Sequence, residues 1–351
     1  MSVLRNTLNM RNLSPLSLLV LTACGGGTST ISTFLTSASG KVIKGPLNNA
    51  LVGLDYDGDG VVDSATVRTD ANGSYSISTT QKTYTVIAVT DESTVDTSSG
   101  TVLSGVTLKA PEGATVITPT TTLMKEGNLT AEQVASVLGL PDGVDPLTFN
   151  PYADGVSASD ALAVEKASQQ IMSVVTAFAS AAEGAGATEA AAYTAALNSI
   201  VEVVKTKAAS NDTLDLTKTA DLALIKTQAK TEMASTSGVN TTAFDALADD
   251  TATAVENVNT KIATVSDLTS DASKNIFSTT QVLADQVKTA AAAEVSSSGT
   301  GNITFTDASV VNTAASNKAP TNITLSKNAI SEAASSLVIG TLTTADGDQT
   351  T

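Results

Sequence analysis

The chain contains no histidine, no tryptophan and a single cysteine among its 351 residues. Without histidine there is no Ser-His-Asp or Cys-His nucleophile system and no imidazole to carry protons. A single cysteine excludes an intramolecular disulfide and a zinc site built from cysteines. Aromatic residues make up only 3% of the chain, which disfavours stacking platforms for sugars. We therefore expect that the protein is not an enzyme.

Positive charge is also scarce. The chain has 19 Lys and Arg residues against 35 Asp and Glu residues, and its formal net charge is −16. Nucleic-acid affinity depends on clustered Lys and Arg, so we expect no nucleic-acid partner. The abundant carboxylates and hydroxyls instead suit hard cations with oxygen ligands, such as Ca²⁺.

The single cysteine follows a short apolar segment. Arg5 and Arg11 precede the apolar residues 13–23. This apolar segment has about half the roughly 20 residues that a membrane-spanning helix needs, so it is typical of a signal peptide. Small residues before Cys24 and three glycines after it resemble a bacterial lipoprotein signal. That resemblance implies that residues 1–23 are removed and that Cys24 carries lipid. The alternative is an ordinary secretory signal with an incidental cysteine.

The lipid sets the expected location of the protein. Several acyl chains on Cys24 would hold the chain firmly on a membrane. No Asp follows Cys24 directly, which favours sorting to the outer membrane of a Gram-negative bacterium, with exposure at the cell surface. The Gly-, Ser- and Thr-rich residues 24–39 then predict a flexible tether.

Residues 40–117 are predicted to form a small all-β sandwich. Short apolar runs alternate with turn residues over this segment, as in sandwich domains. Strands are expected at residues 42–43, 51–54, 65–69, 74–78, 84–89 and 102–108. The turn at residues 70–73 joins two of them as a hairpin, with Gly73 supplying a positive φ.

An acidic loop, residues 55–63, lies between two of these strands. Its carboxylates occupy positions 1, 3, 5 and 9 of an EF-hand-type calcium loop, with Gly60 at position 6. The predicted calcium ligands are the side chains of Asp55, Asp57, Asp59 and Asp63 and the main-chain carbonyl of Val61. Thr66 stands where a bidentate Glu is expected at position 12, so the affinity should be weakened. The alternative is a solvated acidic turn.

This stretch resembles a known class of modules. With Lys-Val-Ile-Lys-Gly-Pro-Leu at residues 41–47 and Thr-Asp-Ala-Asn-Gly-Ser-Tyr at residues 69–75, it looks like carboxypeptidase-regulatory-like and B-type immunoglobulin-like domains of bacterial surface adhesins. The resemblance implies a spacer or a calcium-stiffened stalk unit, not an enzyme.

Residues 118–296 predict an Ala-rich, all-α bundle. Thr130 and Gln133 form a capping box that opens a short helix ending near Leu138. Apolar residues then recur at three- and four-residue spacing over five segments that are expected to be helices of 15 to 25 residues. The breaks between helices are expected at Gly184, Gly186, Asn211, Gly238 and Ser270. The opening of this region resembles helical segments near the N-termini of large surface proteins of aquatic bacteria.

No chemical site is apparent in these helices. Glu165, Glu183, Glu189 and Glu202 are scattered along the sequence, and a Glu-x-x-His metal pair cannot exist without histidine. Tyr193 is expected in the core or on the surface, not in a catalytic role.

The C-terminal residues 297–318 read as a linker, and residues 319–351 resemble the start of a cadherin-like repeat. In such repeats an early Glu and a later Asp-x-Asp pair bind calcium at domain junctions; the matching residues are Glu332, Asp346 and Asp348. The alternative is three exposed loop acids. Because a sandwich of this kind needs about 100 residues, we expect a truncated β-sandwich and a protein that continues beyond Thr351.

Three functions fit these features. The first is a lipid-anchored, calcium-binding surface protein that acts in calcium-dependent cell adhesion, or as the membrane-proximal stalk of a large adhesin, with other surface proteins or repeats as partners. The second is a non-catalytic stalk of a surface hydrolase whose catalytic domain lies beyond residue 351. The third is a periplasm-facing lipoprotein that binds a peptide or a sugar.

Overall fold

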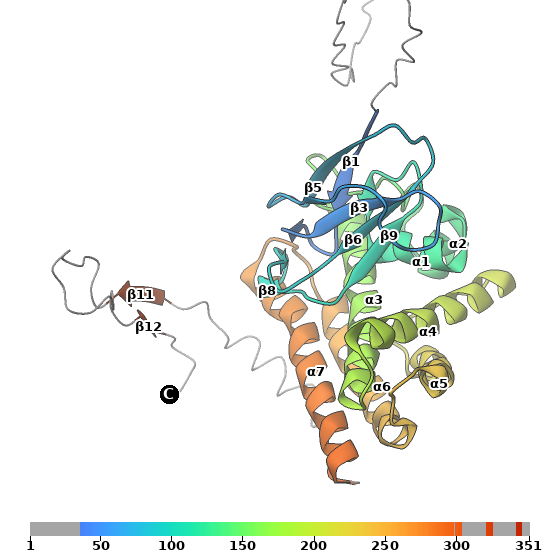
Figure 1. Ribbon diagram of the computed structural model, residues 1–351, viewed down its shortest axis with the longest axis vertical. Coiled ribbons are helices and arrows are strands. Elements are labelled where there is room, and N and C mark those ends of the chain that lie inside the picture. Colours follow the sequence, from blue (N-terminus) through green and yellow to red (C-terminus); the bar gives the residue numbers. More distant parts are fainter. Residues whose placement is uncertain (1–35, 298, 304–320, 326–341, 346–351) are drawn as a thin grey trace, which may run out of the picture. The chain divides into compact units, whose positions relative to one another are not determined.

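The computed structural model describes residues 36–297, 299–303, 321–325 and 342–345. A β-sandwich-like region with three sheets comes first, and a region of seven helices follows it (Figure 1). The expected order of an all-β segment before an all-α segment is therefore confirmed.

Ten short strands form the β region. They are β1 (Thr36–Val42), β2 (Leu47–Asn48), β3 (Leu51–Asp55), β4 (Val67–Arg68), β5 (Ser74–Thr79), β6 (Thr85–Val89), β7 (Val95–Asp96), β8 (Thr101–Val102), β9 (Thr107–Ala110) and β10 (Val116–Ile117). The sheets have the orders β10-β1-β5, β2-β7-β8 and β4-β3-β6-β9. All pairs are antiparallel except β1 with β10, which is parallel.

Several details of the β region differ from the sequence prediction, and the short strands β2, β7 and β10 were not predicted. Strand β1 begins at Thr36, inside the expected tether, because residues 36–41 pair with β5. The predicted strand at residues 102–108 is divided between β8 and β9, since Gly105 takes a positive φ of 71° between them. The turn at residues 70–73 has the expected positive φ at Gly73, but it connects β4 and β5 of different sheets and so forms no hairpin.

Seven helices form the second region. They are α1 (Pro119–Gly127), α2 (Ala131–Val137), α3 (Ala158–Gly184), α4 (Glu189–Ser210), α5 (Thr219–Ser235), α6 (Thr241–Ala263) and α7 (Asp271–Ser296). The five long helices α3–α7 match the five predicted apolar repeats and are 17 to 27 residues in length.

The helix termini follow from local sequence. The predicted capping box is present at α2, where Thr130 Oγ1 accepts from Gln133 N and Gln133 Oε1 accepts from Thr130 N. Asn211 ends α4 in a left-handed conformation, which suits Asn. Helix α1 was not predicted, although Thr118 at its N-cap and Pro119 at its first position are a recognised helix start.

The core runs without a break from the β region into the helices. Buried apolar residues of the strands and of α3, α4 and α6 belong to one hydrophobic cluster. Tyr193 of α4 is 6% exposed, and its hydroxyl donates to the carbonyl of Thr107 in β9 at 2.7 Å. Tyr193 is therefore a core residue that links α4 to β9.

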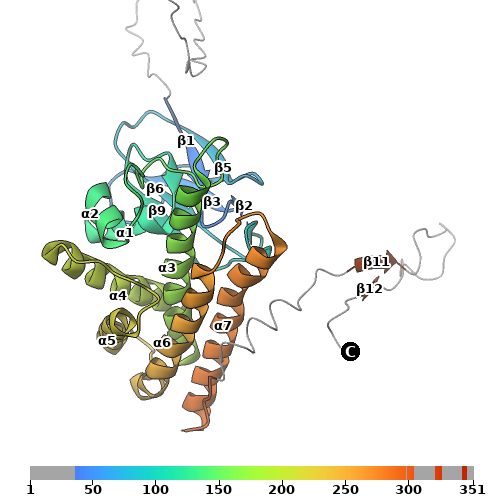
Figure 2. The same cartoon turned by 180° about the vertical axis from the view of Figure 1, so that it is seen from behind.

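Helix α3 lies at the centre of the helical region. It contacts α4, α6 and α7, and the view from behind shows it running from the strands down between these helices (Figure 2). Small residues allow the close approach of α3 and α7: a Cβ added at Gly184 would lie 2.2 Å from the carbonyl oxygen of Lys288.

Two further strands belong to the C-terminal segment. Strands β11 (Thr321–Leu325) and β12 (Leu342–Ala345) pair antiparallel, with Leu325 opposite Leu342. This agrees with the expected strand character of residues 319–351 at the level of a single strand pair.

Candidate metal centre

The acidic loop is fixed at both of its ends by strand β3. Asp55 is the last residue of β3, and on the far side of the loop the amide of Asp63 donates to the carbonyl of Leu54 at 2.8 Å. Ser64 Oγ accepts from the amide of Leu54 at 2.8 Å. Val62 packs directly on Gly53, where an added Cβ would lie 2.2 Å from Val62 Cγ1. The loop is therefore closed at its base by hydrogen bonds and by packing.

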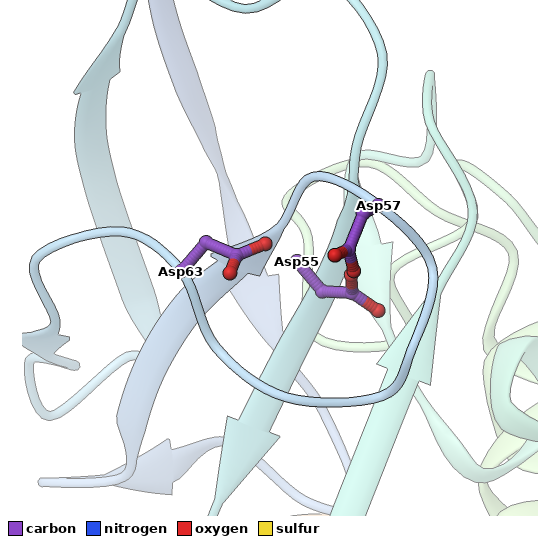
Figure 3. A group of neighbouring side chains, drawn as sticks. All are labelled: Asp55, Asp57 and Asp63. Carbon is purple, nitrogen blue, oxygen red and sulfur yellow. The ribbon is translucent and has the colours of Figure 1, made fainter.

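Three of the four predicted carboxylates converge inside this loop. One oxygen from each of Asp55, Asp57 and Asp63 lies within 4.8 Å of the others. Figure 3 shows the carboxyl group of Asp57 beside that of Asp55, and that of Asp63 extending toward them from the other side of the loop. Asp55 is buried, whereas Asp57 and Asp63 are exposed, so the cluster opens to solvent on one side.

Backbone amides hold Asp55 in place. Its Oδ1 accepts from the amide of Gly58 at 2.7 Å, and its Oδ2 accepts from the amide of Gly60 at 3.0 Å. Gly58 and Gly60 have φ values of 83° and 87°, a conformation that L side chains rarely adopt. The predicted turn at Gly60 is thus present, and Gly58 makes a second turn that was not predicted.

The remaining carboxylates keep oxygens available. Asp57 Oδ1 accepts from the amide of Asp59, and Asp63 Oδ2 accepts from the amide of Tyr56. These two hydrogen bonds leave the other carboxylate oxygens, Oδ2 of Asp57 and Oδ1 of Asp63, available to a cation. Asp59 lies outside the three-carboxylate group and accepts from the amide of Val61 at 2.8 Å.

No family model, curated protein or solved structure matches this chain.

A lysine lies next to the acidic loop on the side of the helices. An added Cβ at Gly60 would lie 3.5 Å from Lys109 Nζ, and this ammonium pairs with Glu126 of α1 at 2.6 Å. Gly60, Lys109 and Glu126 line a cleft of about 360 Å³ that continues along β9 to the start of α4. The loop therefore borders a mixed-charge surface that joins it to the helical region.

The other predicted site residues lie outside the described part of the chain. These are Cys24, Glu332, Asp346 and Asp348. Among the described helices, none has the length and apolar character needed to cross a membrane.

The structure also brings together polar and charged residues that lie far apart in the sequence and were not predicted to meet, Glu165 among them. Lys44, Asp96, Ser98, Glu165 and Gln169 are all buried where the β region meets α3. Lys44 Nζ pairs with Asp96 Oδ2 at 2.7 Å, although the two residues lie 52 positions apart. These five residues are called the buried polar cluster below.

Proposed function

We propose that this chain is a calcium-binding surface protein whose acidic loop takes one Ca²⁺ ion. The observation that carries the proposal is the convergence of Asp55, Asp57 and Asp63 in a loop closed at both ends. Carboxylate oxygens are the preferred ligands of hard cations, and Ca²⁺ accepts flexible coordination by six to eight oxygens. The two positive charges of a bound Ca²⁺ ion would offset most of the repulsion among these three carboxylates.

The chemistry of the donor set favours modest affinity. Three side chains supply only part of a calcium shell, so water and main-chain carbonyls such as that of Val61 would supply the rest. Position 12 is Thr66, which cannot give two carboxylate oxygens. We therefore expect a dissociation constant on the order of 10⁻⁴–10⁻³ M, the range of extracellular calcium modules.

The wider role rests on the sequence. Lipid on Cys24 would attach the chain to the outer membrane, and the β and helical regions would form the base of an adhesin that extends into cadherin-like repeats from residue 319. Calcium at the acidic loop would stiffen this base, and calcium at Glu332, Asp346 and Asp348 would stiffen the junction to the next repeat. The antiparallel pair β11–β12 supports a β fold for that segment.

Calorimetry on the full chain tests the calcium site. The full chain is needed because the β region shares its core with the helices. CaCl₂ should give saturable heat with a stoichiometry near one, and about 10 mM Ca²⁺ should stabilise the fold by about 1.4–2.7 kcal/mol at the expected affinity.

Two substitutions give the matched comparison. Asp57→Asn keeps an oxygen that can accept from the amide of Asp59 but removes the charge, so it should weaken binding by at least about tenfold. Asp142→Asn changes an exposed Asp outside the loop and should leave binding unchanged. The proposal for the loop is wrong if millimolar Ca²⁺ gives no heat, or if Asp57→Asn binds as well as the unsubstituted chain.

A further inference from the structure

The buried polar cluster connects three separate parts of the chain. Lys44 lies between β1 and β2, Asp96 is in β7, and Glu165 and Gln169 lie one turn apart on α3. Lys44 is 3% exposed, and Asp96, Glu165 and Gln169 have no exposed surface. Three ionisable side chains thus meet inside the protein where helix α3 contacts the β region.

Lys44 and Asp96 form a buried ion pair. The ammonium of Lys44 lies 2.7 Å from Asp96 Oδ2, and Asp96 Oδ1 accepts from both the amide and the hydroxyl of Ser98, at 2.8 and 2.7 Å. Gly45 allows this approach: with φ of 66°, it leaves no room for a Cβ, which would lie 2.2 Å from Asp96 Oδ1. The positive charge of Lys44 is therefore matched by Asp96 and does not neutralise Glu165.

Glu165 has a different environment. Its Oε1 accepts from Gln169 Nε2 at 2.7 Å, and the same amide nitrogen donates to Ser98 Oγ at 3.1 Å. Three buried oxygens nearby have no hydrogen-bond partner among the described residues, namely Glu165 Oε2, Gln169 Oε1 and the hydroxyl oxygen of Tyr152. An ionised Glu165 can only accept hydrogen bonds, whereas a protonated one adds an O–H donor. The Tyr152 hydroxyl can itself donate a hydrogen bond, but Glu165 Oε2 and Gln169 Oε1 are two buried acceptors, so a proton on Glu165 would supply this group with one further donor.

The surrounding groups act on the pKa of Glu165 in opposite directions, and burial has the largest effect. Burial raises this pKa to about 7. The Gln169 amide and the Lys44 ammonium lower this pKa, Asp96 raises it, and the Tyr152 hydroxyl lowers it. These groups come from α3, the β1–β2 connection, β7 and the segment before α3. Burial outweighs them because it penalises the charged carboxylate directly.

We propose that Glu165 is a proton-linked contact between helix α3 and the β region, closed when the carboxyl group holds a proton and weakened when the proton leaves. The contact does not involve the acidic loop, so it goes beyond the proposed calcium function and does not depend on it. It would make the fixation of the helices to the β region sensitive to pH near neutrality.

The direction of the pH dependence follows from linkage. The pKa of Glu165 is higher in the fold, at about 7, than its ordinary value of 4.5. The folded protein therefore holds this proton more tightly than the unfolded chain does. Its stabilising contribution is complete below about pH 4.5 and is lost as the pH rises through about 7.

Chemical denaturation of the full chain and of Glu165→Gln at about pH 5 and about pH 8.5 tests the proposal. The Gln side chain keeps an amide donor at every pH, so it imitates the protonated acid. Between these two pH values, the unfolding equilibrium constant of the unsubstituted chain should rise by about 70-fold more than that of Glu165→Gln. Glu202→Gln, which changes an acid that is 45% exposed on α4, should show the same pH dependence as the unsubstituted chain.

Parallel pH profiles for the unsubstituted chain and Glu165→Gln would overturn the proposal. Should Glu165→Gln fail to fold, carbon-13 NMR of the Glu165 carboxyl group in the unsubstituted chain gives a direct titration. A midpoint near 7 supports the proton-linked contact, and a midpoint near 4.5 refutes it.

Discussion

Replacing Lys44 by methionine would leave a carboxylate without its counter-ion inside the protein. Asp96 has no exposed surface and lies 2.7 Å from the Lys44 ammonium. The two hydrogen bonds from Ser98 would remain, but neither brings a positive charge. Breaking a buried ion pair by removing one partner typically costs about 3–5 kcal/mol. Since the stability of a whole domain is about 5–15 kcal/mol, Lys44→Met should consume a large part of it.

Urea denaturation of the full chain near neutral pH measures this cost. The informative comparison is the double variant Lys44→Met with Asp96→Asn, which removes both charges and keeps an oxygen that can accept from Ser98. It should be more stable than Lys44→Met alone, because no unpaired charge is then buried. A loss below about 1 kcal/mol for Lys44→Met, or a double variant no more stable than the single one, would refute this account of the pair.

Two further predictions concern the anchor and the contact between the two regions. Cys24→Ser should move the protein from the membrane fraction to the soluble fraction of fractionated cells, because the lipid would have no attachment point; continued membrane association would exclude the lipoprotein interpretation. Tyr193→Phe should lower the unfolding free energy by about 1 kcal/mol, because the hydrogen bond to the Thr107 carbonyl is lost; an unchanged urea midpoint would show that this bond contributes no stability.

Local sequence was sufficient for much of the fold. The strands β3, β5 and β6 lie where short apolar runs predicted them, and the five long helices lie where apolar residues recur at helical spacing. These predictions were correct because each element buries one face, and the spacing of apolar residues in its sequence shows which face that is. Helix α1 was missed because its nine residues are too few for a clear repeat, although Thr118 and Pro119 mark its start.

The candidate metal site was also predictable from local sequence. The acidic loop is a contiguous segment, so the spacing of Asp55, Asp57 and Asp63 already fixes which carboxylates can meet. Asp59 illustrates the limit of this reasoning, since its side chain forms a local turn with Val61 and lies outside the group.

The buried polar cluster could not be found by reading the sequence. Lys44 and Asp96 are 52 positions apart, and Ser98 and Gln169 are 71 positions apart. No periodicity relates them, and Glu165 looks like any other acid on an Ala-rich helix. Such contacts depend on how α3 docks on the β region, which is a property of the tertiary fold.

The central position of β1 bears on how the protein would respond to mechanical load. This strand is the first described element after Cys24, and it lies between β5 and β10 in its sheet. A load directed along β1 would act in shear on its whole ladder with β5, from Thr36 opposite Thr79 to Lys41 opposite Ser74. Unzipping would break the same bonds one at a time. A load in this direction would therefore have to break the ladder as a unit, whereas a load across the strand would open it stepwise.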